Sequence, residues 1–305
     1  MLRYWTAGES HGKTLLAVVD GFPAGIEIDT DSIDYDLRMR QGGYGRGGRQ
    51  QIETDKVELL TGVWKNVSMG SPVTLQVINR DYKLEKLKEL ERPRPGHGDL
   101  TGAVKFLGSI RNVLERSSAR ETAVRVAAGA LAKQILAEFQ IECIGFVDEL
   151  GGQQIDRQAG DIQQWRTLRE QSEVYSLNPE QDPKIKQLID QAEEQGDTLG
   201  GILEVHVTGL PFGLGTHAQW DRKLDGRIAQ AVMAVQAIKG VEIGLGFEAA
   251  RRPGSQVHDP ITYDADKKDT PSLGFQRPTN NAGGLEAGMT NGQSLVVRAA
   301  KKPIS

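Results

Sequence analysis

The segment from residue 92 to residue 140 constrains the fold of this chain more than any other stretch. It opens with a proline- and glycine-rich loop that contains His97. Ser118 and Glu121 have the spacing of a capping box, which predicts a helix from Ser118 to about Gln140. Apolar residues then recur with the period of an α-helix, which is typical of a helix with one buried stripe: Val124, Ala127, Ala128, Leu131, Ile135 and Leu136.

Arginines are dense around the predicted start of this helix: Arg111, Arg116, Arg120 and Arg125. A helix N-terminus has unpaired amides and the positive end of the helix dipole, so arginines and serines beside it favour a bound phosphate. An ordinary capped helix with solvated charges would give the same pattern.

Bulk properties narrow the class of protein. A length of 305 residues allows one large domain or two ordinary ones. The net charge of −4 argues against a general nucleic-acid binder. Cys143 is the one cysteine, so no disulfide can form within the chain and a reducing compartment is expected. No apolar run reaches the roughly 18 residues of a membrane span, and no signal-peptide core is present. We therefore expect a cytoplasmic protein without a membrane partner.

The N-terminal stretch places His11 in a loop after a short strand. The motif Gly8-Glu-Ser-His-Gly12 fits a nucleophile elbow, and residues 7–14 fit a P-loop apart from the first position. Both motifs require a helix directly afterwards. Residues 15–19 are a short apolar run that ends in a turn, which predicts a strand and disfavours both motifs. Histidine is the usual acid or base near neutral pH, although most loop histidines are only surface groups.

A glycine-rich loop follows a predicted helix at residues 30–40, for which Thr30 or Asp31 is the expected cap. In residues 41–49, dense glycines let backbone amides and the guanidinium groups of Arg46 and Arg49 converge on an oxyanion. Residues 43–48 also spell Gly-x-Gly-x-x-Gly, but after a helix and before a strand, the wrong order for a dinucleotide fold. A glycine hairpin with solvated arginines, or an RNA-binding segment, are the alternatives.

The rest of the sequence predicts further strands at residues 59–63, 72–78, 141–147 and 294–298. Residues 81–91 are predicted to form a solvated charge run. Residues 251–277 are predicted to be loop-like, and residues 280–292 to form a glycine-rich loop. Residues 149–199 are polar and read as a peripheral excursion without catalytic groups, in which residues 184–194 form an amphipathic helix. His206 falls on a strand face. No residue cluster has metal-ligand spacing, so no metal is expected.

Residues 203–213 echo residues 15–25, because three turn residues match at one offset: Gly21, Pro23 and Gly25 against Gly209, Pro211 and Gly213. A helix is predicted after each, the second at residues 224–238. The chain is therefore interpreted as a single 1–305 domain of two related halves, roughly 1–148 and 200–305. Chance similarity at turn residues is the alternative.

Several long motifs together resemble chorismate synthase. They are Gly8-Glu-Ser-His-Gly12, Gly42-Gly-Tyr-Gly-Arg-Gly-Gly-Arg49, Arg94-Pro-Gly-His-Gly-Asp99, Glu115-Arg-Ser-Ser-Ala-Arg-Glu-Thr122, Trp220-Asp-Arg-Lys-Leu-Asp225, Lys239-Gly-Val-Glu-Ile-Gly244 and Asn280-Asn-Ala-Gly-Gly284. The resemblance covers nearly the whole chain.

The resemblance implies an α+β fold in which helices are sandwiched between two antiparallel β-sheets, with internal duplication and homotetrameric assembly. It implies a shikimate-pathway lyase that makes chorismate from 5-enolpyruvylshikimate 3-phosphate by anti-1,4-elimination of phosphate. It also implies a flavoprotein that needs reduced FMN, with NADPH as a candidate reductant. The partner is then a small molecule, not nucleic acid.

Site residues carried over from the family motifs fall into three groups. His11 would donate a proton near the leaving phosphate, and His97 would lie near the reduced flavin ring. Arg40, Arg46 and Arg49 would hold the substrate's phosphate and carboxylates. The flavin contacts implied by the resemblance are Arg116, Ser117, Ser118, Gln236, Ala237, Ala287, Lys302, Pro303, Ile304 and Ser305.

The sequence departs from the family pattern in two places. The segment between Lys105 and Arg111 is shorter than in the family. The chain ends at Ser305, where the family continues with a segment that carries an active-site aspartate and arginine.

Three alternative functions remain open. They are a flavin reductase, a serine hydrolase built on Ser10, and a polyanion- or RNA-binding module that uses the arginine–glycine loop.

Overall fold

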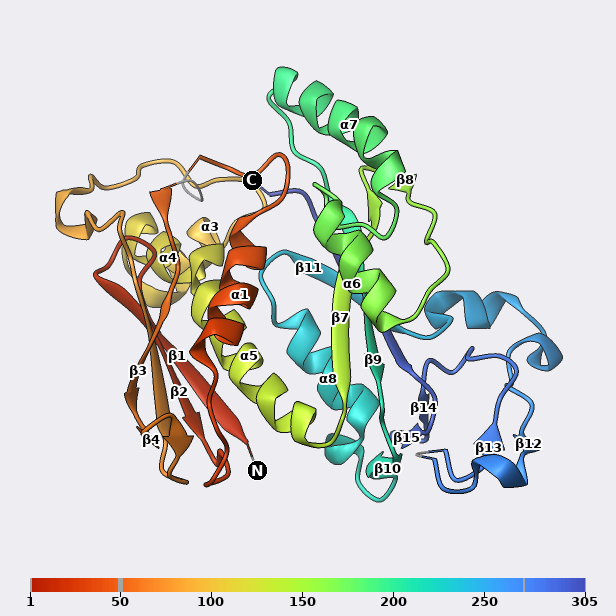
Figure 1. Ribbon diagram of the computed structural model, residues 1–305. Coiled ribbons are helices and arrows are strands. Elements are labelled where there is room, and N and C mark those ends of the chain that lie inside the picture. The colour runs from red at the N-terminus through yellow and green to blue at the C-terminus, as the bar shows by residue number, and fades with distance from the viewer. Residues whose placement is uncertain (1, 49–51, 271, 305) are drawn as a thin grey trace. The chain divides into compact units, whose positions relative to one another are not determined.

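The computed structural model describes residues 2–48, 52–270 and 272–304 (Figure 1). The chain divides into two compact units, one that extends to Leu136 and one from Ala137 to Ile304. We refer to them as unit 1 and unit 2. Among the described residues, no helix combines the length and apolar character needed to cross a bilayer.

Unit 1 is built on an antiparallel sheet with the strand order β1-β2-β6-β3. These strands are β1 (Arg3–Gly8), β2 (Thr14–Asp20), β3 (Val57–Thr61) and β6 (Val73–Ile78). In β2, Leu15, Ala17 and Val19 are buried and alternate with less buried residues, as expected for a strand with one face on the core. The predicted strand at residues 15–19 is confirmed, and no helix follows the His11 loop as a nucleophile elbow or P-loop would require.

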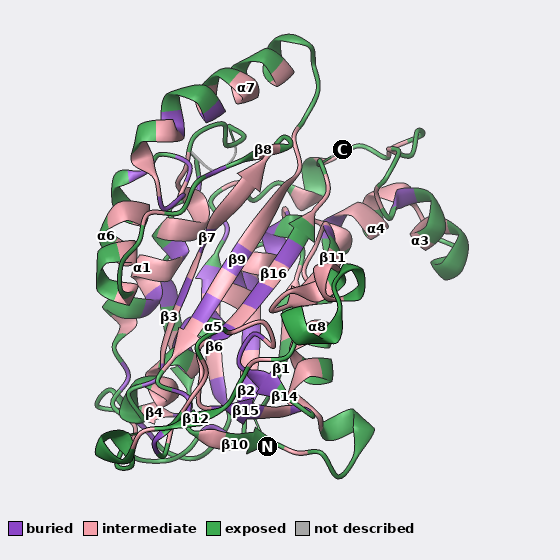
Figure 2. Cartoon of the chain, turned by 90° about the vertical axis from the view of Figure 1, so that its right-hand side faces the viewer, coloured by how far each residue is buried: buried purple, intermediate pink, exposed green. Residues whose placement is uncertain are grey.

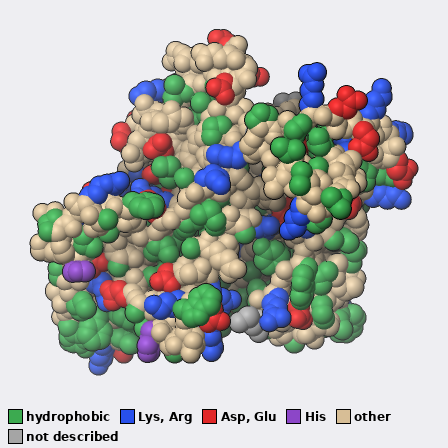
Figure 3. Space-filling model, turned by 180° about the vertical axis from the view of Figure 1, so that it is seen from behind, with side chains coloured by type: hydrophobic (Ala, Val, Ile, Leu, Met, Phe, Trp, Pro, Cys, Tyr) green, Lys and Arg blue, Asp and Glu red, His purple; other side chains and the backbone are tan. Residues whose placement is uncertain are grey.

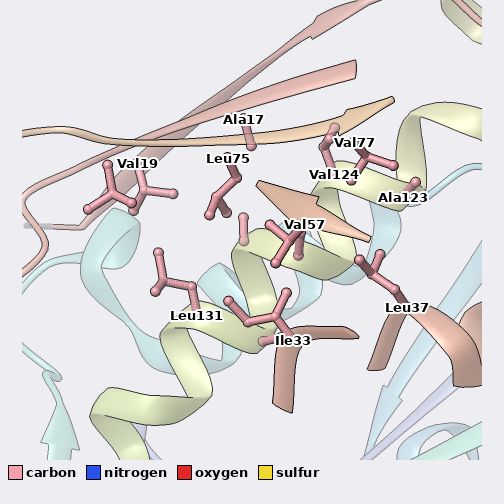
Figure 4. Packing of buried hydrophobic residues seen from close by; sticks show 14 of the residues in the cluster. Ala17, Val19, Ile33, Leu37, Val57, Leu75, Val77, Ala123, Val124 and Leu131 are labelled. Carbon is pink, nitrogen blue, oxygen red and sulfur yellow. The ribbon is translucent and has the colours of Figure 1, made fainter. Parts of the chain in front are cut away.

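Two helices share the core with the buried face of this sheet. They are α1 (Thr30–Gln41) and α5 (Thr122–Glu138). Ile33 and Leu37 of α1 are buried in the same cluster as Val124 and Leu131 of α5, and Figure 4 shows these side chains gathered together with those of the strands. The predicted helix at residues 30–40 and the apolar stripe of α5 are confirmed. The predicted cap of α1 is wrong, because the side chain of Asp29, one residue earlier, accepts the Asp31 amide.

The predicted capping box at the start of α5 is also wrong. The chain instead forms α4 (Ile110–Ser117), the 3-10 turn η2 (Ala119–Glu121) and then α5. The Ser118 hydroxyl accepts from the Arg120 amide, within η2. Glu121 does not turn back to Ser118. Its carboxylate accepts a 2.6 Å hydrogen bond from the Thr6 hydroxyl and pairs with Arg125. Tertiary partners therefore compete with the local cap.

The remaining elements of unit 1 are short. A hairpin of β4 (Val63–Trp64) and β5 (Val67–Ser68) joins β3 to β6, and η1 (Leu84–Lys86) lies in the predicted charge run. Helix α3 (Asp99–Phe106) packs against α4 through Gly102. A Cβ atom there would lie 2.4 Å from Cγ1 of Val113, so this contact requires glycine.

Unit 2 contains an antiparallel sheet with the order β11-β16-β9-β7-β8. Its strands are β7 (Glu142–Leu150), β8 (Gln153–Gln154), β9 (Gly201–Thr208), β11 (Ile238–Ile243) and β16 (Leu295–Lys301). Figure 2 shows buried and half-buried residues alternating along β9 and β16. The predicted strands at residues 141–147 and 294–298 are confirmed by β7 and β16.

The polar stretch at residues 149–199 contains two helices, α6 (Ile162–Gln171) and α7 (Asp182–Glu194), with η3 (Pro179–Gln181) before α7. The predicted amphipathic helix is confirmed, because Ile185, Leu188 and Ile189 of α7 pack in one small apolar cluster with Ile155 and Val174. Helix α6 was not predicted, although Asp161 and Gln164 form a full capping box at its start.

The C-terminal part of unit 2 needs two corrections. Helix α8 (Leu224–Met233) ends five residues before the predicted end, because Ala237 has a left-handed φ of 68° and Ile238 already begins β11. The predicted glycine-rich loop at 280–292 contains a hairpin of β14 (Leu285–Glu286) and β15 (Met289–Asn291). Its two-residue turn is Ala287-Gly288, with φ values of 51° and 84°.

Strand β15 also pairs with β10 (Phe212–Gly215). The region predicted as loop-like holds a small hairpin of β12 (Thr262–Tyr263) and β13 (Phe275–Gln276). Short 3-10 turns complete unit 2: η4 (Trp220–Arg222), η5 (Gly246–Arg251), η6 (Gly254–Gln256) and η7 (Ala265–Lys267).

We predict that Leu131→Ala destabilises the protein by about 2–5 kcal/mol, because Leu131 is fully buried between helix and sheet and truncation leaves a cavity. Urea unfolding followed by far-UV circular dichroism measures this loss. Leu100→Ala is the control, because Leu100 is 59% exposed on α3 and its truncation should change stability by about 0.5 kcal/mol or less. Equal losses in the two variants would contradict the assigned core.

Candidate active site

The loop that carries His11 is bound through its backbone carbonyl groups by one buried side chain, Asn79. The loop joins β1 to β2, and the Asn79 amide nitrogen lies 2.8 Å from the Gly12 carbonyl, 3.1 Å from that of Glu9 and 3.3 Å from that of Ser10. Asn79 is 4% exposed. Because its amide group faces several carbonyls of one tight turn, the loop has a defined conformation at the end of the two strands.

Asn79 is fixed in turn by an ion pair in the interior of unit 1. Nε of Arg120 donates to Oδ1 of Asn79 at 2.8 Å, and the guanidinium group makes a bidentate pair with Asp55 at 2.7 and 2.8 Å. Glu53 lies 3.5 Å from the same guanidinium. All these residues are buried. A buried charge is tolerated when it is paired and hydrogen-bonded, as here.

The His11 imidazole is bound through Nδ1 to a buried carboxylate. The two carboxylate oxygens of Glu115, on α4, lie 3.0 and 3.1 Å from Nδ1, and one of them accepts the His11 backbone N–H at 2.8 Å. Nε2 lies 3.8 Å from a carboxylate oxygen of Asp81. The predicted solvated charge run at 81–91 has an exception at Asp81, whose side chain is 17% exposed and faces His11.

The predicted flavin-binding segment Arg116-Ser117-Ser118 lies against the same loop. Ser118 accepts a 3.1 Å hydrogen bond from the Ser10 hydroxyl. The Arg116 guanidinium donates to the carbonyls of Thr6 and Gly8 at 2.8 and 3.1 Å. The Ser117 hydroxyl donates to the Val113 carbonyl within α4. The structure therefore brings together two motifs that are about a hundred positions apart along the chain.

The His97 loop contains its own carboxylate. Nδ1 of His97 lies 2.5 Å from Oδ1 of Asp99, which is fully buried at the start of α3. The other oxygen of Asp99 accepts from the Arg94 amide and from its Nε at 3.1 and 3.0 Å. Burial alone would raise the pKa of the Asp99 carboxyl. The hydrogen bonds from Arg94, with the charges of His97 and Arg94, outweigh that effect and lower this pKa to about 2.

The two histidine loops are both positioned by α4. Glu115 binds the His11 loop, whereas Val113 and Ser117, two residues to either side of Glu115, face the helix that begins just after His97. A Cβ atom at Gly98 would lie 3.6 Å from that of Ser117, so the His97 loop approaches the end of α4 closely.

The predicted substrate arginines differ in their surroundings. Arg40, near the end of α1, donates to Thr122, to the Ala119 carbonyl and to Asp55 at 3.0, 3.2 and 3.3 Å, so it takes part in the buried network. Arg46 is exposed, and its Nε donates to the Gly42 carbonyl at 2.9 Å. Arg49 lies outside the described residues.

Two of the predicted flavin segments in unit 2 are adjacent, because β11 and β16 are paired there. The Lys302 amide donates to the Ala237 carbonyl at 2.9 Å, which places Gln236 and Ala237 beside the segment 302–304. The Thr198 hydroxyl donates to the Ile304 carbonyl. Pro303 lies between Lys302 and Ile304 in the sequence. Ala287 lies in the β14–β15 turn, and Ser305 is outside the described residues.

Two cavities have different linings. A hollow of about 330 Å³ in unit 1 lies over the His11 loop and is lined by Gly8, Glu9, Gly12, Lys13, Thr14, Leu16, Tyr82, Leu84 and Glu85. A larger cavity of about 640 Å³ in unit 2 is lined by paired charges that include Glu204, His206 and Arg298. His206 is a strand-face residue, as predicted, and stacks on Phe146. Both candidate histidines, His11 and His97, lie in unit 1.

Sequence reasoning missed the partners that orient the histidines. Asp99 could have been found, because it follows His97 by two residues in a tight turn. Glu115 was noted only as part of a motif, and nothing in the sequence pairs it with His11. Asn79 and Asp81 gave no signal, since their contacts with residues 9–12 depend on strand register.

Comparisons with known proteins support one family. Residues 2–305 match the family model described as chorismate synthase. The chain is 54% identical over 319 residues to the chorismate synthase of Geobacter sulfurreducens, and the match covers 100% of this chain and 81% of that relative. It is 54% identical over 318 residues to that of Geobacter metallireducens, with the same coverage. A solved structure titled "Crystal Structure of Chorismate Synthase" matches with a TM-score of 0.86 at 44% identity, covering 100% of this chain and 84% of that one.

We predict that Arg120→Ala destabilises the protein by about 3–5 kcal/mol, because it leaves the Asp55 and Glu53 carboxylates buried without their main cation. Thermal and urea unfolding measure the change. Lys133→Ala is the control, because Lys133 pairs with Asp36 at the surface and removal of such a pair costs about 1 kcal/mol or less. A loss at Arg120 no larger than the loss at Lys133 would exclude the network as a stabilising element.

The lowered pKa of Asp99 predicts an acid-sensitive His97 loop. A carboxyl group whose pKa is lower in the folded protein stabilises the fold above its ordinary pKa of 3.8, and this contribution is lost as the pH falls toward 2. The free energy of unfolding, measured from pH 6 to pH 2, should therefore decrease less steeply in Asp99→Asn than in the unmodified protein. Parallel curves for the two proteins would contradict this assignment.

Proposed function

The chain belongs to the chorismate synthase family, and from this premise we propose which of its residues carry out the family's reaction. The enzymes of this family are lyases that eliminate phosphate from 5-enolpyruvylshikimate 3-phosphate to give chorismate. The family match over residues 2–305 and relatives above 50% identity give this function. They lend no support to a flavin reductase, a serine hydrolase or an RNA-binding module.

The charge on one face of the molecule gives the RNA-binding module no support. Figure 3 shows Lys and Arg side chains interspersed with Asp and Glu on the face that it draws, and no large area of one sign. Nucleic-acid binding proteins usually present a continuous basic patch or stripe.

The single observation that carries the proposal is the presence in unit 1 of two loop histidines, each bound to a buried carboxylate. We assign His11 as the proton donor near the leaving phosphate and His97 as the second acid–base group, near the flavin ring. A departing phosphate gains negative charge, so a proton and nearby cations stabilise the transition state. Ordered imidazoles that are 16% and 18% exposed at their side chains suit that role, because they remain accessible to a ligand.

The arginines Arg40, Arg46 and Arg49 are proposed to bind the substrate's phosphate and carboxylates. Planar guanidinium groups match such oxyanions with paired hydrogen bonds. Arg40 also donates to Asp55 in the interior, so substrate bound there would be coupled to the network that holds the His11 loop. Arg46 lies in the glycine-rich loop, whose backbone can approach an anion closely.

Reduced FMN is the cofactor that we propose for this chain, and the residues present fit it. In unit 1 the Arg116 guanidinium uses three of its five N–H donors on Thr6 and Gly8, which leaves donors for an anionic group. In unit 2 the Lys302 amide joins its segment to Ala237, so two of the predicted contact segments lie together. Gln236, Ala287, Pro303, Ile304 and Ser305 complete the proposed set. When bound, the reduced flavin would act as a transient electron donor, and NADPH is the proposed reductant of the flavin.

We also propose the sandwich of helices between two sheets, internal duplication into halves of roughly 1–148 and 200–305, homotetrameric assembly and a cytoplasmic location. Backbone conformation supports the duplication. Gly21 and Gly209 have φ values of 79° and 77°, and Gly25 and Gly213 have φ values of 85° and 86°. Matched left-handed glycines at matched turn positions are expected if the two stretches share an ancestor.

We predict that His11→Ala and His97→Ala each lower the turnover number by roughly 10²–10⁴-fold, the usual contribution of a general acid or base. The dissociation constant of the substrate should change far less. Chorismate formation is measured anaerobically with reduced FMN, and substrate affinity is measured by calorimetry.

His217→Ala is the matched control, because His217 is an exposed loop histidine of unit 2 and should tolerate the change. Losses of equal size in turnover and in substrate affinity would rule out the acid–base assignment. Absence of chorismate formation by the unmodified protein would contradict the proposed function itself.

A further inference from the structure

The two candidate histidines share one arrangement although their loops are unrelated in sequence. In each case the ring nitrogen Nδ1 lies against a buried carboxylate. For His11 this is Glu115, at 3.0 Å and 3% exposed, and for His97 it is Asp99, at 2.5 Å and fully buried. A single histidine–carboxylate pair could result from packing alone. Two such pairs, one at each proposed acid–base group, indicate that the carboxylates have the same role in both.

We propose that Glu115 and Asp99 are positioning residues that hold a proton on Nδ1 of His11 and His97, so that Nε2 is the ring nitrogen that exchanges protons with the ligand. This inference rests on the proposed roles of the two histidines. It adds the carboxylates that set the orientation and the tautomer of each ring.

The hydrogen bonds around Glu115 support this assignment. An ionised carboxylate can only accept, so the Nδ1 atom that it contacts must donate. Glu115 also accepts the His11 backbone N–H at 2.8 Å, which prevents it from rotating away. Arg111 lies 3.5 Å from the carboxylate and pairs with its charge. The ring nitrogen on the opposite side, Nε2, is directed toward Asp81 and away from α4.

Asp99 is held in an equivalent way by different donors. Its Oδ2 atom accepts from the Arg94 amide and Nε, and its Oδ1 atom lies within hydrogen-bonding distance of His97 Nδ1 and Arg94 Nη2. Three donors from Arg94 fix the carboxylate, so it can orient the imidazole. The second histidine of the site therefore carries its positioning carboxylate two residues along the chain.

The amide variants Glu115→Gln and Asp99→Asn test the proposal because they replace an acceptor-only carboxylate by an amide without removing volume. In Asp99→Asn the amide oxygen stays on the Arg94 amide and Nε, so the NH₂ group faces Nδ1 of His97 and donates to it, and the ring proton moves to Nε2. In Glu115→Gln the oxygen stays on the His11 backbone N–H, and Nδ1 of His11 then faces one amide oxygen and one NH₂ group, so it is no longer bound by acceptors alone.

The first measurement is the tautomer of each ring, read from ¹⁵N shifts of histidine-labelled protein and assigned by single histidine substitutions. At a pH at which the rings are neutral, we expect Nδ1–H for His11 and His97 in the unmodified protein; the proton that a ring gives to the ligand is a second one, carried on Nε2. We expect Nε2–H for His97 in Asp99→Asn, and loss of the single Nδ1–H tautomer for His11 in Glu115→Gln. The second measurement is catalytic, and the turnover number should fall by roughly 10²–10⁴-fold in each variant, with little change in substrate affinity.

Two further variants separate positioning from loss of structure. Glu115→Asp keeps an acceptor-only carboxylate, so it should retain the Nδ1–H tautomer and more activity than Glu115→Gln. Asp182→Asn removes a buried carboxylate that accepts from Ser172 and the Glu173 amide and contacts no histidine. It should leave both tautomers and the turnover number close to those of the unmodified protein.

Several outcomes would overturn the proposal. They are Nε2–H tautomers in the unmodified protein, Nδ1–H tautomers retained in both amide variants, or full turnover by both variants. If Glu115→Gln does not fold, Glu115→Asp and Asp99→Asn still decide the question. If the unmodified protein forms no chorismate, the proposed function fails, whereas the tautomer measurement still tests the positioning role by itself.

Discussion

The buried ion pair between Arg120 and Asp55 is the interaction on which the site in unit 1 depends. Removing two charges from water is costly, and the cost is offset here by a bidentate geometry and by further hydrogen bonds to Asn79. Asn79 then holds the carbonyl groups of the His11 loop. A buried polar network of this kind therefore determines where the His11 loop lies, because its members come from three separate stretches of the chain.

The same ion pair explains why the chain turns at Ser118 and does not continue as one long helix. Ser118 and Glu121 have the right spacing for a capping box, but Arg120 between them reaches into the interior and Glu121 binds Thr6. Local patterns predicted the strands at residues 15–19 and 141–147 and the buried faces of α1 and α5 correctly, since alternation and the helical period report burial directly. They were wrong where long-range partners set the backbone, as at Ser118 and at Ala237.

The candidate site shows the same division between local and distant information. The sequence could indicate His11, His97 and the arginines as candidates, because they stand in motifs that resemble those of a known family. It could not indicate that Glu115 binds His11, because the two are 104 positions apart and meet only when α4 packs against the loop. The role of Asp99 could have been predicted from the sequence, since a carboxylate two residues after a histidine in a tight turn can reach the histidine ring.

This difference has a physical consequence for how the two histidines respond to their surroundings. His97, Asp99 and Arg94 belong to one short segment, so their hydrogen bonds persist if the segment moves as a body. The orientation of His11 instead depends on the packing of α4 and on the network through Asn79, because Glu115 is supplied by the helix. Although α4 packs against both loops, a change in the interior of unit 1 should therefore alter the orientation of the His11 ring more than that of His97, whose carboxylate partner lies in its own segment. A site that needs both imidazoles is in this sense limited by the stability of its core.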